Sequence, residues 1–316
     1  MSPLPAVFFL FVDGLGLGRP DPAVNPLVGG GLPWLTAIAG RSLAAGPWMP
    51  GISYRAELPG GLRPAALVAC DAGLGVEGLP QSATGQAALF TGVNAAALVG
   101  RHVNAYPTGR LKDLIDSRSL FRRAAEAGRR VTFANAFSPE YFELVATRRL
   151  RHSASTLAVL AAGLVLRDLE QLRAGQAVYQ DITNRALIAR GHQVPLVEPA
   201  QAGRNAAAVA GGHDLTVFEY FQTDLAGHRA DPAAARRVLE VLDGFLGGLL
   251  EGLDSSRHLL ALAADHGNIE DLAVATHTMN PVPALFLGEG AEAAAAGVSS
   301  ITDLAPAILG HLGVPA

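Results

Sequence analysis

Carboxylate and imidazole side chains gather in the last hundred residues at spacings that suit metal binding. The segment TDLAGH places Asp224 and His228 four residues apart, and ADHGN places Asp265 directly before His266. His277 follows in ATHTMNPVP. Each residue alone is more often a turn, a helix cap or a structural histidine. Together they favour zinc or manganese, which accept mixed imidazole and carboxylate ligands.

A cluster of small and hydroxylated residues could complete such a site. The stretch LPQSATGQAALFTGV (79–93) places Ser82 and Thr84 ahead of an Ala-rich helical pattern. At a helix N-terminus, backbone N–H groups and the helix dipole favour an anion. A bound metal can also lower the pKa of a hydroxyl there and make it a nucleophile. The structural alternative is an ordinary Ser N-cap.

The candidate ligands follow segments that the sequence predicts to be buried strands. Asp13 ends the first apolar run, and the other acidic pairs follow later runs. The apolar runs are 6–12, 131–134, 215–221, 259–264 and 282–287. Helical patterns lie between or after them at 117–130, 231–253 and 303–313. This alternation predicts an α/β fold with a mainly parallel central sheet and helices on both faces. Ligand crevices in such sheets lie at the carboxyl ends of strands, so separate strand ends can bring the ligands together.

The segment 136–212 fits the strand–helix rhythm least well. We therefore expect a single domain over 1–316, with 136–212 as a variable, partly helical elaboration. These 77 residues are few for an independent α/β cap domain, so we expect no full cap over the site.

Composition excludes several functional classes. The chain has 316 residues, of which 50% are hydrophobic, and a net charge of −4, which gives no reason to expect nucleic-acid binding. A single cysteine, Cys70, excludes an internal disulfide framework. No apolar run approaches a membrane span, and the N-terminal segment lacks the basic start of a signal peptide. We expect a cytoplasmic protein of unknown oligomeric state.

Taken together, the motifs resemble the alkaline phosphatase superfamily, especially its branch with cofactor-independent phosphoglycerate mutase and phosphopentomutase. FVDGLG resembles the first metal-binding motif, TDLAGH the Asp-x-x-x-His motif, and ADHGN with HTMNPVP the later mutase motifs. SATGQAALFTGV aligns without gaps with the alkaline phosphatase stretch that begins at the nucleophilic serine. The resemblance covers residues 6–18, 79–110 and 215–287.

By position, the resemblance implies two metal sites, for two Mn²⁺ or Zn²⁺ ions. One site would use Asp224, His228 and His277. The other would use the carboxylates and imidazole of Asp13, Asp265 and His266 together with the oxygen of Ser82. Ser82 would be the nucleophile, with Thr84 as its rival.

The resemblance also suggests substrate contacts. GRHVNAYP (100–107) faintly resembles the segment in which nucleotide pyrophosphatases place a phosphate-binding Asn, which makes Asn104 a candidate. Arg101 or Arg110 could grip a phosphate with two hydrogen bonds. Exposed surface arginines are an equally good interpretation. Cys70 is not in the context that sulfatases modify, which argues against a sulfatase.

These features predict a two-metal-ion phosphohydrolase that acts on a small phosphate ester through a phosphoseryl intermediate. The first alternative is a phosphomutase, and the second is a non-catalytic metal-binding protein. Gln86 stands where the mutases have a His, four residues after the nucleophile. Because of Gln86 and the missing cap domain, we expect an open site and net hydrolysis.

Overall fold

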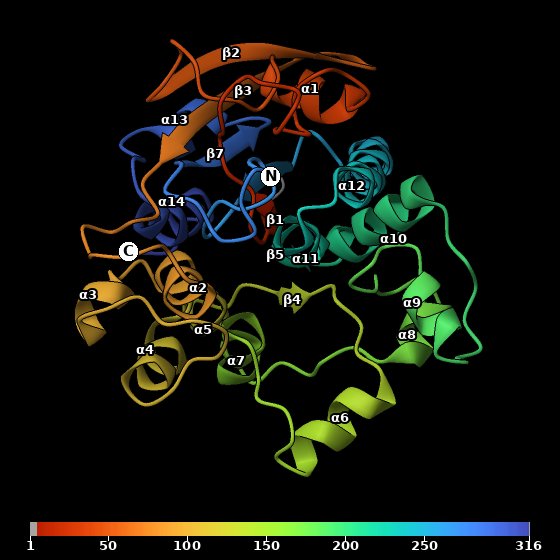
Figure 1. Cartoon of the computed structure of the whole chain (residues 1–316). Helices are drawn as coiled ribbons and strands as arrows, with labels where there is room; N and C mark the ends of the chain where they lie inside the picture. Colours follow the sequence, from red (N-terminus) through yellow and green to blue (C-terminus); the bar gives the residue numbers. More distant parts are fainter. Residues whose placement is uncertain (1–4, 316) are drawn as a thin grey trace.

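A seven-stranded sheet forms the centre of the computed structural model, which describes residues 5–315 (Figure 1). Residues 1–4 of the N-terminal segment assessed above, and residue 316, lie outside the described part. The strand order is β2-β3-β7-β6-β1-β5-β4.

One half of the sheet is parallel and carries the candidate ligands. Strand β1 (Ala6–Val12) lies between β5 (Leu215–Tyr220) and β6 (His258–Ala263) and pairs with both in parallel. Strand β4 (Val131–Phe133) extends this half beyond β5. Every residue of these four strands is buried, which explains why each one appears in the sequence as a continuous apolar run.

The other half of the sheet is antiparallel, so the prediction of a mainly parallel sheet is only partly right. Strand β7 (Val282–Leu287) runs against β6, β3 (Gly61–Cys70) runs against β7, and β2 (Gly51–Leu58) runs against β3. The hairpin of β2 and β3 is absent from the sequence prediction because β2 is an edge strand whose residues are mostly exposed or half-buried. An apolar run such as β7 also carries no information about strand direction.

Helices cover both faces of the sheet, as predicted (Figure 1). Along β1, Phe9 and Phe11 contact Phe90 of α2, with ring centroids 6.2 and 5.4 Å apart. On the opposite face, Phe218 of β5 contacts Phe245 of α12 at 5.0 Å. One helical layer contains α1 (Pro33–Ala39), α10 (Pro199–Gly211), α11 (Gln222–Arg229) and α12 (Pro232–Gly252). The other contains α2 (Ser82–Thr91), α4 (Arg110–Arg118), α5 (Leu120–Glu126), α7 (Ala154–Ala161), α13 (Ala291–Ala295) and α14 (Leu304–His311).

The predicted helix 117–130 differs from the observed α5 at both ends, whereas 231–253 agrees with α12 to within one residue at each end. The predicted helix 117–130 is shorter, because α5 begins after Ser119, whose hydroxyl accepts the N–H of Arg122 at 3.4 Å. Ser117 belongs to the preceding helix, α4. The prediction for 231–253 is confirmed by α12, where Asp231 accepts the N–H groups of Ala233 and Ala234.

The segment 136–212 is joined to the framework by two of its helices. Helix α7 packs against α2, α4 and α5, and α10 packs along α12. The shorter helices of this segment are α6 (Pro139–Ala146), α8 (Leu169–Arg173) and α9 (Arg185–Ala189). Helix α3 (Ala95–Val99) lies outside the segment, between α2 and α4 in the chain. Helices α8 and α9 share a small apolar cluster of their own. Among the described residues, no helix is both long and apolar enough to cross a bilayer.

Two glycines allow α10 and α12 to touch backbone to backbone. A Cβ atom built on Gly203 would collide with the carbonyl oxygen of Phe245, and one built on Gly248 would collide with the carbonyl oxygen of Ala200. Neither carbonyl can move without shifting its helix, so only glycine fits this contact.

We expect Gly248→Ala to lower the free energy of unfolding by roughly 1–3 kcal/mol, because the added methyl overpacks the helix contact. Gly211→Ala, at the end of α10, is the matched control, since its Cβ would meet no atom within 4 Å. The control should be neutral or slightly stabilising. Urea unfolding of both variants tests this, and equal midpoints would contradict the packing argument.

Candidate metal centre

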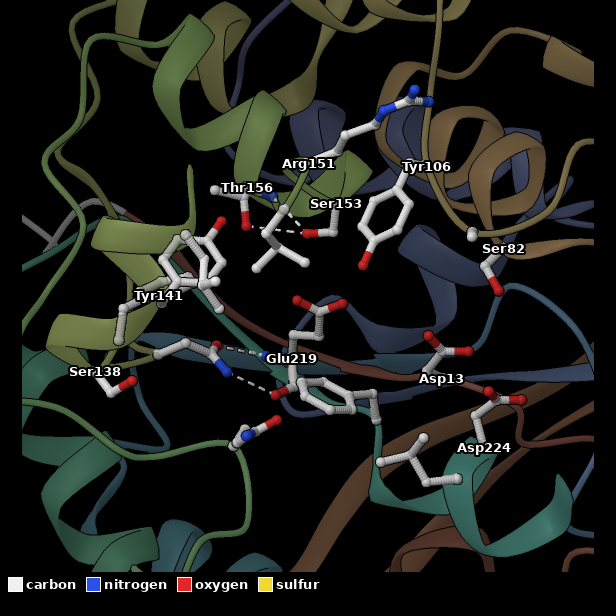
Figure 2. Close-up of a pocket in the computed structure, with 18 of the residues that line it drawn as sticks. Asp13, Ser82, Tyr106, Ser138, Tyr141, Arg151, Ser153, Thr156, Glu219 and Asp224 are labelled. Atoms are coloured by element: carbon white, nitrogen blue, oxygen red, sulfur yellow. Dashed lines mark hydrogen bonds between the residues drawn. The ribbon is translucent and has the colours of Figure 1, made fainter. Parts of the chain in front are cut away.

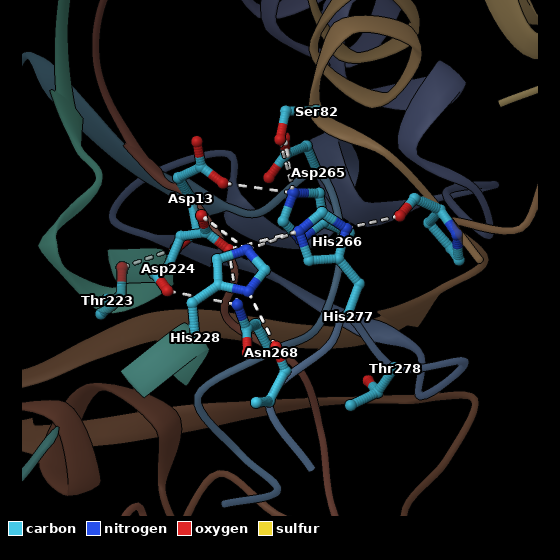
Figure 3. A network of polar contacts seen from close by, with 12 residues as sticks. Asp13, Ser82, Thr223, Asp224, His228, Asp265, His266, Asn268, His277 and Thr278 are labelled. Atoms are coloured by element: carbon cyan, nitrogen blue, oxygen red, sulfur yellow. Dashed lines mark hydrogen bonds and ion pairs between the residues drawn. The ribbon is translucent and has the colours of Figure 1, made fainter. Parts of the chain in front are cut away.

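The ends of three parallel strands meet at one edge of the sheet and bring the predicted ligands together (Figure 3). Asp13 follows β1, and its N–H donates to the carbonyl oxygen of Tyr220 at the end of β5 at 3.0 Å. Asp224 lies in the first turn of α11, just after β5. Asp265 and His266 follow β6. The sequence argument from strand ends therefore has a direct structural basis.

The first group of candidate ligands consists of Asp224, His228 and His277, whose ligand atoms lie within 4.8 Å of one another. The Nε2 atoms of His228 and His277 are 3.4 and 3.5 Å from the Asp224 carboxylate and 3.2 Å from each other. Their Nδ1 atoms contact the carbonyl oxygens of Ala275, at 3.0 Å, and Pro80, at 2.7 Å. A carbonyl only accepts, so each Nδ1 carries the proton and each Nε2 lone pair faces the group.

The second group surrounds the buried His266. Its Nε2 atom lies 3.0 Å from Ser82 Oγ, 3.3 Å from Asp13 Oδ1 and 3.5 Å from Asp265 Oδ2. The predicted second set is thus assembled around one imidazole. Asp13, Asp224 and His266 offer ligand atoms that lie within 4.8 Å of one another, so Asp224 belongs to both groups.

The carboxylates repel one another in a buried space. Burial, followed by the charges of Asp265 and Asp224, raises the pKa of Asp13 well above its usual range. Burial and the charge of Asp224 raise the pKa of Asp265 to about 8. Burial also raises the pKa of Asp224, but its interactions with His277, His266 and Asn268 outweigh burial and hold that pKa at about 2. Burial lowers the pKa of His266 to about 3, so this imidazole is a neutral ligand.

Several buried polar atoms of this centre have no hydrogen-bond partner in the described part of the chain. They are Asp13 Oδ1, both carboxylate oxygens of Asp265 and Nδ1 of His266. Buried carboxylates without partners are costly unless a cation accepts their lone pairs. The donor set of carboxylate oxygens and imidazole nitrogens therefore fits divalent transition metals.

Three residues hold these side chains in place through hydrogen bonds, a role that the sequence argument did not predict. The Gln86 side chain donates to Asp13 Oδ2 at 3.0 Å, and the Asn268 side chain donates to Asp224 Oδ1 at 2.7 Å. The buried Glu270 accepts the N–H groups of Gly16, at 3.0 Å, and Asn268, at 2.7 Å, and also the Thr278 hydroxyl. In the sequence, Glu270 looks like any acidic residue in a loop, so no local signal reveals it.

The two candidate nucleophiles lie in different environments. Ser82 is the first residue of α2, and its hydroxyl faces His266 (Figure 3). The N-cap is Gln81, so the interpretation of Ser82 as an ordinary N-cap is wrong. Thr84 is fully buried, and its hydroxyl donates to the Gln81 carbonyl and accepts the N–H of Val103, both at 3.1 Å.

The N-terminus of α2 is not an open anion site. The N–H groups of Ala83 and Thr84 both donate to the carbonyl oxygen of Val103, at 3.1 and 3.4 Å. The expected contact between an anion and these two amides is therefore not available. What recommends Ser82 is its contact with the ligand cluster.

A cavity of about 530 Å³ opens beside the centre (Figure 2). Asp13, Ser82 and Asp224 line one end, and residues of 136–212 line the other, including Tyr141 and Thr156. The elaboration therefore forms one wall of the cavity, and the expectation of an open site stays a prediction.

The predicted substrate-binding residues divide into two groups. Asn104 lines the cavity. Arg101 and Arg110 do not line it; both are exposed, and Arg110 donates to the carbonyl oxygen of Leu98 at 3.2 Å. Arg151 and Arg190, from the elaboration, line the cavity instead. The sequence could not reveal them, because 136–212 carries no recognisable motif.

Comparison with known proteins now identifies the C-terminal part of the chain. Residues 196–316, which contain five of the candidate ligands, match the family described as Metalloenzyme superfamily. This match covers less than half of the chain. The resemblance to alkaline phosphatases and mutases predicted from the motifs is thereby confirmed.

Curated proteins similar to this chain are 2,3-bisphosphoglycerate-independent phosphoglycerate mutases. The enzyme of Desulforudis audaxviator is 34% identical over 109 residues, which are 33% of this chain and 21% of that protein. The enzyme of Dinoroseobacter shibae is 35% identical over 116 residues, which are 34% and 23%. The matched part thus spans less than a quarter of the length of either relative.

Two solved structures share the fold of this chain over nearly its whole length. Phosphoglycerate mutase of Leishmania mexicana has a TM-score of 0.59 at 10% identity, over 99% of this chain and 96% of that one. Alkaline phosphatase of the Antarctic bacterium TAB5 has a TM-score of 0.57 at 12% identity, over 99% and 100%. The alkaline-phosphatase-like fold is therefore established.

We expect the chain to bind two divalent ions, and Mn²⁺ or Zn²⁺ to raise the melting temperature of chelator-treated protein, because binding to the folded state stabilises it. Asp13→Asn and His277→Ala should each reduce the ion count measured by elemental analysis to about one per chain. Asp113→Asn, on the exposed face of α4, is the control and should keep both ions. A wild-type protein that binds neither Mn²⁺ nor Zn²⁺ would refute the ligand assignment.

Proposed function

We propose that this metalloenzyme transfers phosphoryl groups of a small phosphate ester through a phosphoseryl intermediate on Ser82. The observation that carries the proposal is the position of Ser82 Oγ, 3.0 Å from His266 Nε2 and on the wall of the same cavity as Asp13 and Asp224. Thr84, the rival nucleophile, has its hydroxyl engaged on both sides and does not line the cavity.

The residues that would hold the metals surround this hydroxyl. When bound, two Mn²⁺ or Zn²⁺ ions would offset the charge of the phosphoryl oxygens and lower the pKa of the Ser82 hydroxyl. The candidate ligands are Asp13, Ser82, Asp224, His228, Asp265, His266 and His277. Asn268 and Gln86 orient two of the carboxylates through their amide N–H groups.

The proposed reaction has two displacements at phosphorus. In the first, Ser82 Oγ forms a bond to phosphorus while the bond to the alcohol oxygen breaks, and the alcohol takes up a proton. In the second, a hydroxyl group attacks the phosphorus and releases Ser82. The identity of this second hydroxyl separates a mutase from a hydrolase.

We favour the phosphomutase, in which the second hydroxyl belongs to the substrate. The curated relatives are named as phosphoglycerate mutases. A mutase must also retain its dephosphorylated intermediate and limit access of water, which a covered cavity helps to do. Tyr141 and Leu144 of α6 and Thr156 of α7 line the cavity and would form part of such a cover.

A phosphohydrolase is the second candidate, and Gln86 favours it. The Gln86 amide donates to Asp13 at the position where the mutases have a His. A glutamine cannot exchange protons near neutral pH as a histidine can. If the mutase His has such a role in the second displacement, this chain lacks it.

We expect Ser82→Ala to lower turnover of p-nitrophenyl phosphate by about a thousandfold or more, because the bond-forming oxygen is lost. Thr84→Ser, which keeps the buried hydroxyl, is the matched control and should retain most activity. Acid quenching with ³²P-labelled substrate should place the label on the peptide that contains Ser82. Label on Thr84, or undiminished turnover in Ser82→Ala, would overturn the assignment. A wild-type protein that binds metal but turns over no phosphate ester would favour the non-catalytic alternative.

We expect phosphorus NMR of the Mn²⁺-loaded enzyme with ribose 1-phosphate or 3-phosphoglycerate to show an isomerised ester before free phosphate. This order follows from a phosphoryl group kept in a covered cavity. Free phosphate appearing first, with no isomer, would instead support the phosphohydrolase.

A further inference from the structure

A buried carboxylate outside the metal centre faces the cavity. Glu219, the fifth residue of β5, is 7% exposed and lines the cavity together with Asp13 and Asp224. Figure 2 shows its carboxylate between these two aspartates and the residues Ser153 and Thr156 of the elaboration. Register explains the position, because Glu219 pairs with Phe11 and so points to the same face of the sheet as α2 and α7.

The Glu219 residue is held in place, but among the described residues only one of its two carboxylate oxygens accepts a hydrogen bond. Its backbone N–H donates to Asn135 Oδ1, and its carbonyl accepts the Asn135 amide, both at 2.8 Å. Ser155 Oγ donates to Oε2 of Glu219 at 2.6 Å. Within residues 5–315, Oε1 has no hydrogen-bond partner, and no Arg, Lys or His forms an ion pair with this carboxylate.

An acceptor oriented in this way leaves a place for a donor on the ligand. Burial raises the pKa of Glu219 to about 7, although the hydrogen bond from Ser155 opposes the shift. Because Glu219 lines the cavity and only its Oε2 accepts a hydrogen bond from the described residues, a ligand that supplies a donor gains a hydrogen bond there. A ligand carboxylate at the same place would meet like charge instead.

The remaining walls of the cavity suit an uncharged or cationic group. Aromatic rings line it at Tyr106, Phe137, Tyr141, Tyr179 and Phe221. Such rings pack against the C–H face of a polyol or against a cation. Only Arg151 and Arg190 bring positive charge to the lining, and both side chains are largely exposed.

We propose that Glu219 is a specificity-determining residue that accepts a hydrogen bond from a hydroxyl or ammonium group on the alcohol part of the phosphate ester and disfavours esters that carry a carboxylate. This inference rests on the proposed phosphoryl transfer at Ser82. The inference predicts that the substrate of this chain differs from phosphoglycerate, because the carboxylate of phosphoglycerate would face Glu219. The shared chemistry, a donor toward a carboxylate, could come from a sugar or from an amino alcohol.

Binding without turnover provides the test. Calorimetry on the Mn²⁺-loaded, full-length Ser82→Ala protein would compare ribose 5-phosphate, phosphoethanolamine and 3-phosphoglycerate. We expect one of the first two to bind at least tenfold more tightly than 3-phosphoglycerate, and the tighter of the two identifies the donor as hydroxyl or ammonium. Adding Glu219→Gln should reduce this preference by roughly tenfold or more, because a hydrogen bond to a charged acceptor is lost.

Two further variants test whether the change in binding preference is due to Glu219 itself. Glu140→Gln removes another carboxylate of the cavity lining, one that is exposed and forms an ion pair with His192 at 3.0 Å, and it should leave the preference unchanged. Ser155→Ala keeps the Glu219 side chain and removes only its hydrogen bond from Ser155. A preference against 3-phosphoglycerate that remains in this variant is the second readout if Glu219→Gln folds poorly. A preference that is unchanged in Glu219→Gln, tightest binding of 3-phosphoglycerate, or no binding of any probe would overturn the inference.

Failure of this inference can be told apart from failure of the proposed function. Turnover is measured separately, on protein with Ser82 intact. Selective binding that depends on Glu219, with no phosphoryl transfer from any ester, would support the inference and refute the proposed chemistry. Turnover with no effect of Glu219 on selectivity would do the reverse.

Discussion

Repulsion among three carboxylates at the ends of parallel strands is the constraint on which the rest of the structure depends. Asp13, Asp224 and Asp265 share a largely buried space with the neutral imidazole of His266, and burial together with mutual charge raises the pKa of Asp13 and Asp265. Folding alone does not satisfy such a cluster, because several of its atoms have no partner among the described residues. The cluster is stable when cations accept those lone pairs, so the fold and the chemistry depend on the same charges.

This constraint also explains the close packing around the cluster. Helix α2 approaches the Asp265 loop so closely that a Cβ on Gly85 would lie 2.9 Å from the carbonyl oxygen of Asp265. That approach is what places Ser82 beside His266. The loop that carries His277 is fixed in turn by Glu270, which joins it to the loop after β1. The nucleophile and the ligands therefore sit on backbone segments that have little freedom to move apart.

The sequence predicts those parts of the molecule in which burial determines both the residue types and the position of the segment. Continuous apolar runs revealed β1 and β6 because both strands are buried on both faces, and the ligands following them inherit their place from the strand ends. The β2–β3 hairpin was missed because an exposed edge strand lacks that signal. Glu219 lies inside an apolar run, but only the three-dimensional pairing shows that its carboxylate lies between α7 and the cavity. The functions of Arg101 and Arg110 could not be read from residue type, since the orientation of an exposed side chain depends on the loop that carries it.

The central position of β1 limits how this architecture can be divided. Strands β5 and β6 are not neighbours; each pairs with β1, which comes from the first residues of the described chain. The segment that matches the superfamily, residues 196–316, contains β5 and β6 but lacks the strand that lies between them. It holds Asp224, His228 and His277, yet neither Asp13 nor Ser82. Sequence similarity is therefore concentrated in a piece that is not an autonomous folding unit, and a gene fragment encoding it would yield an interrupted sheet with an incomplete centre.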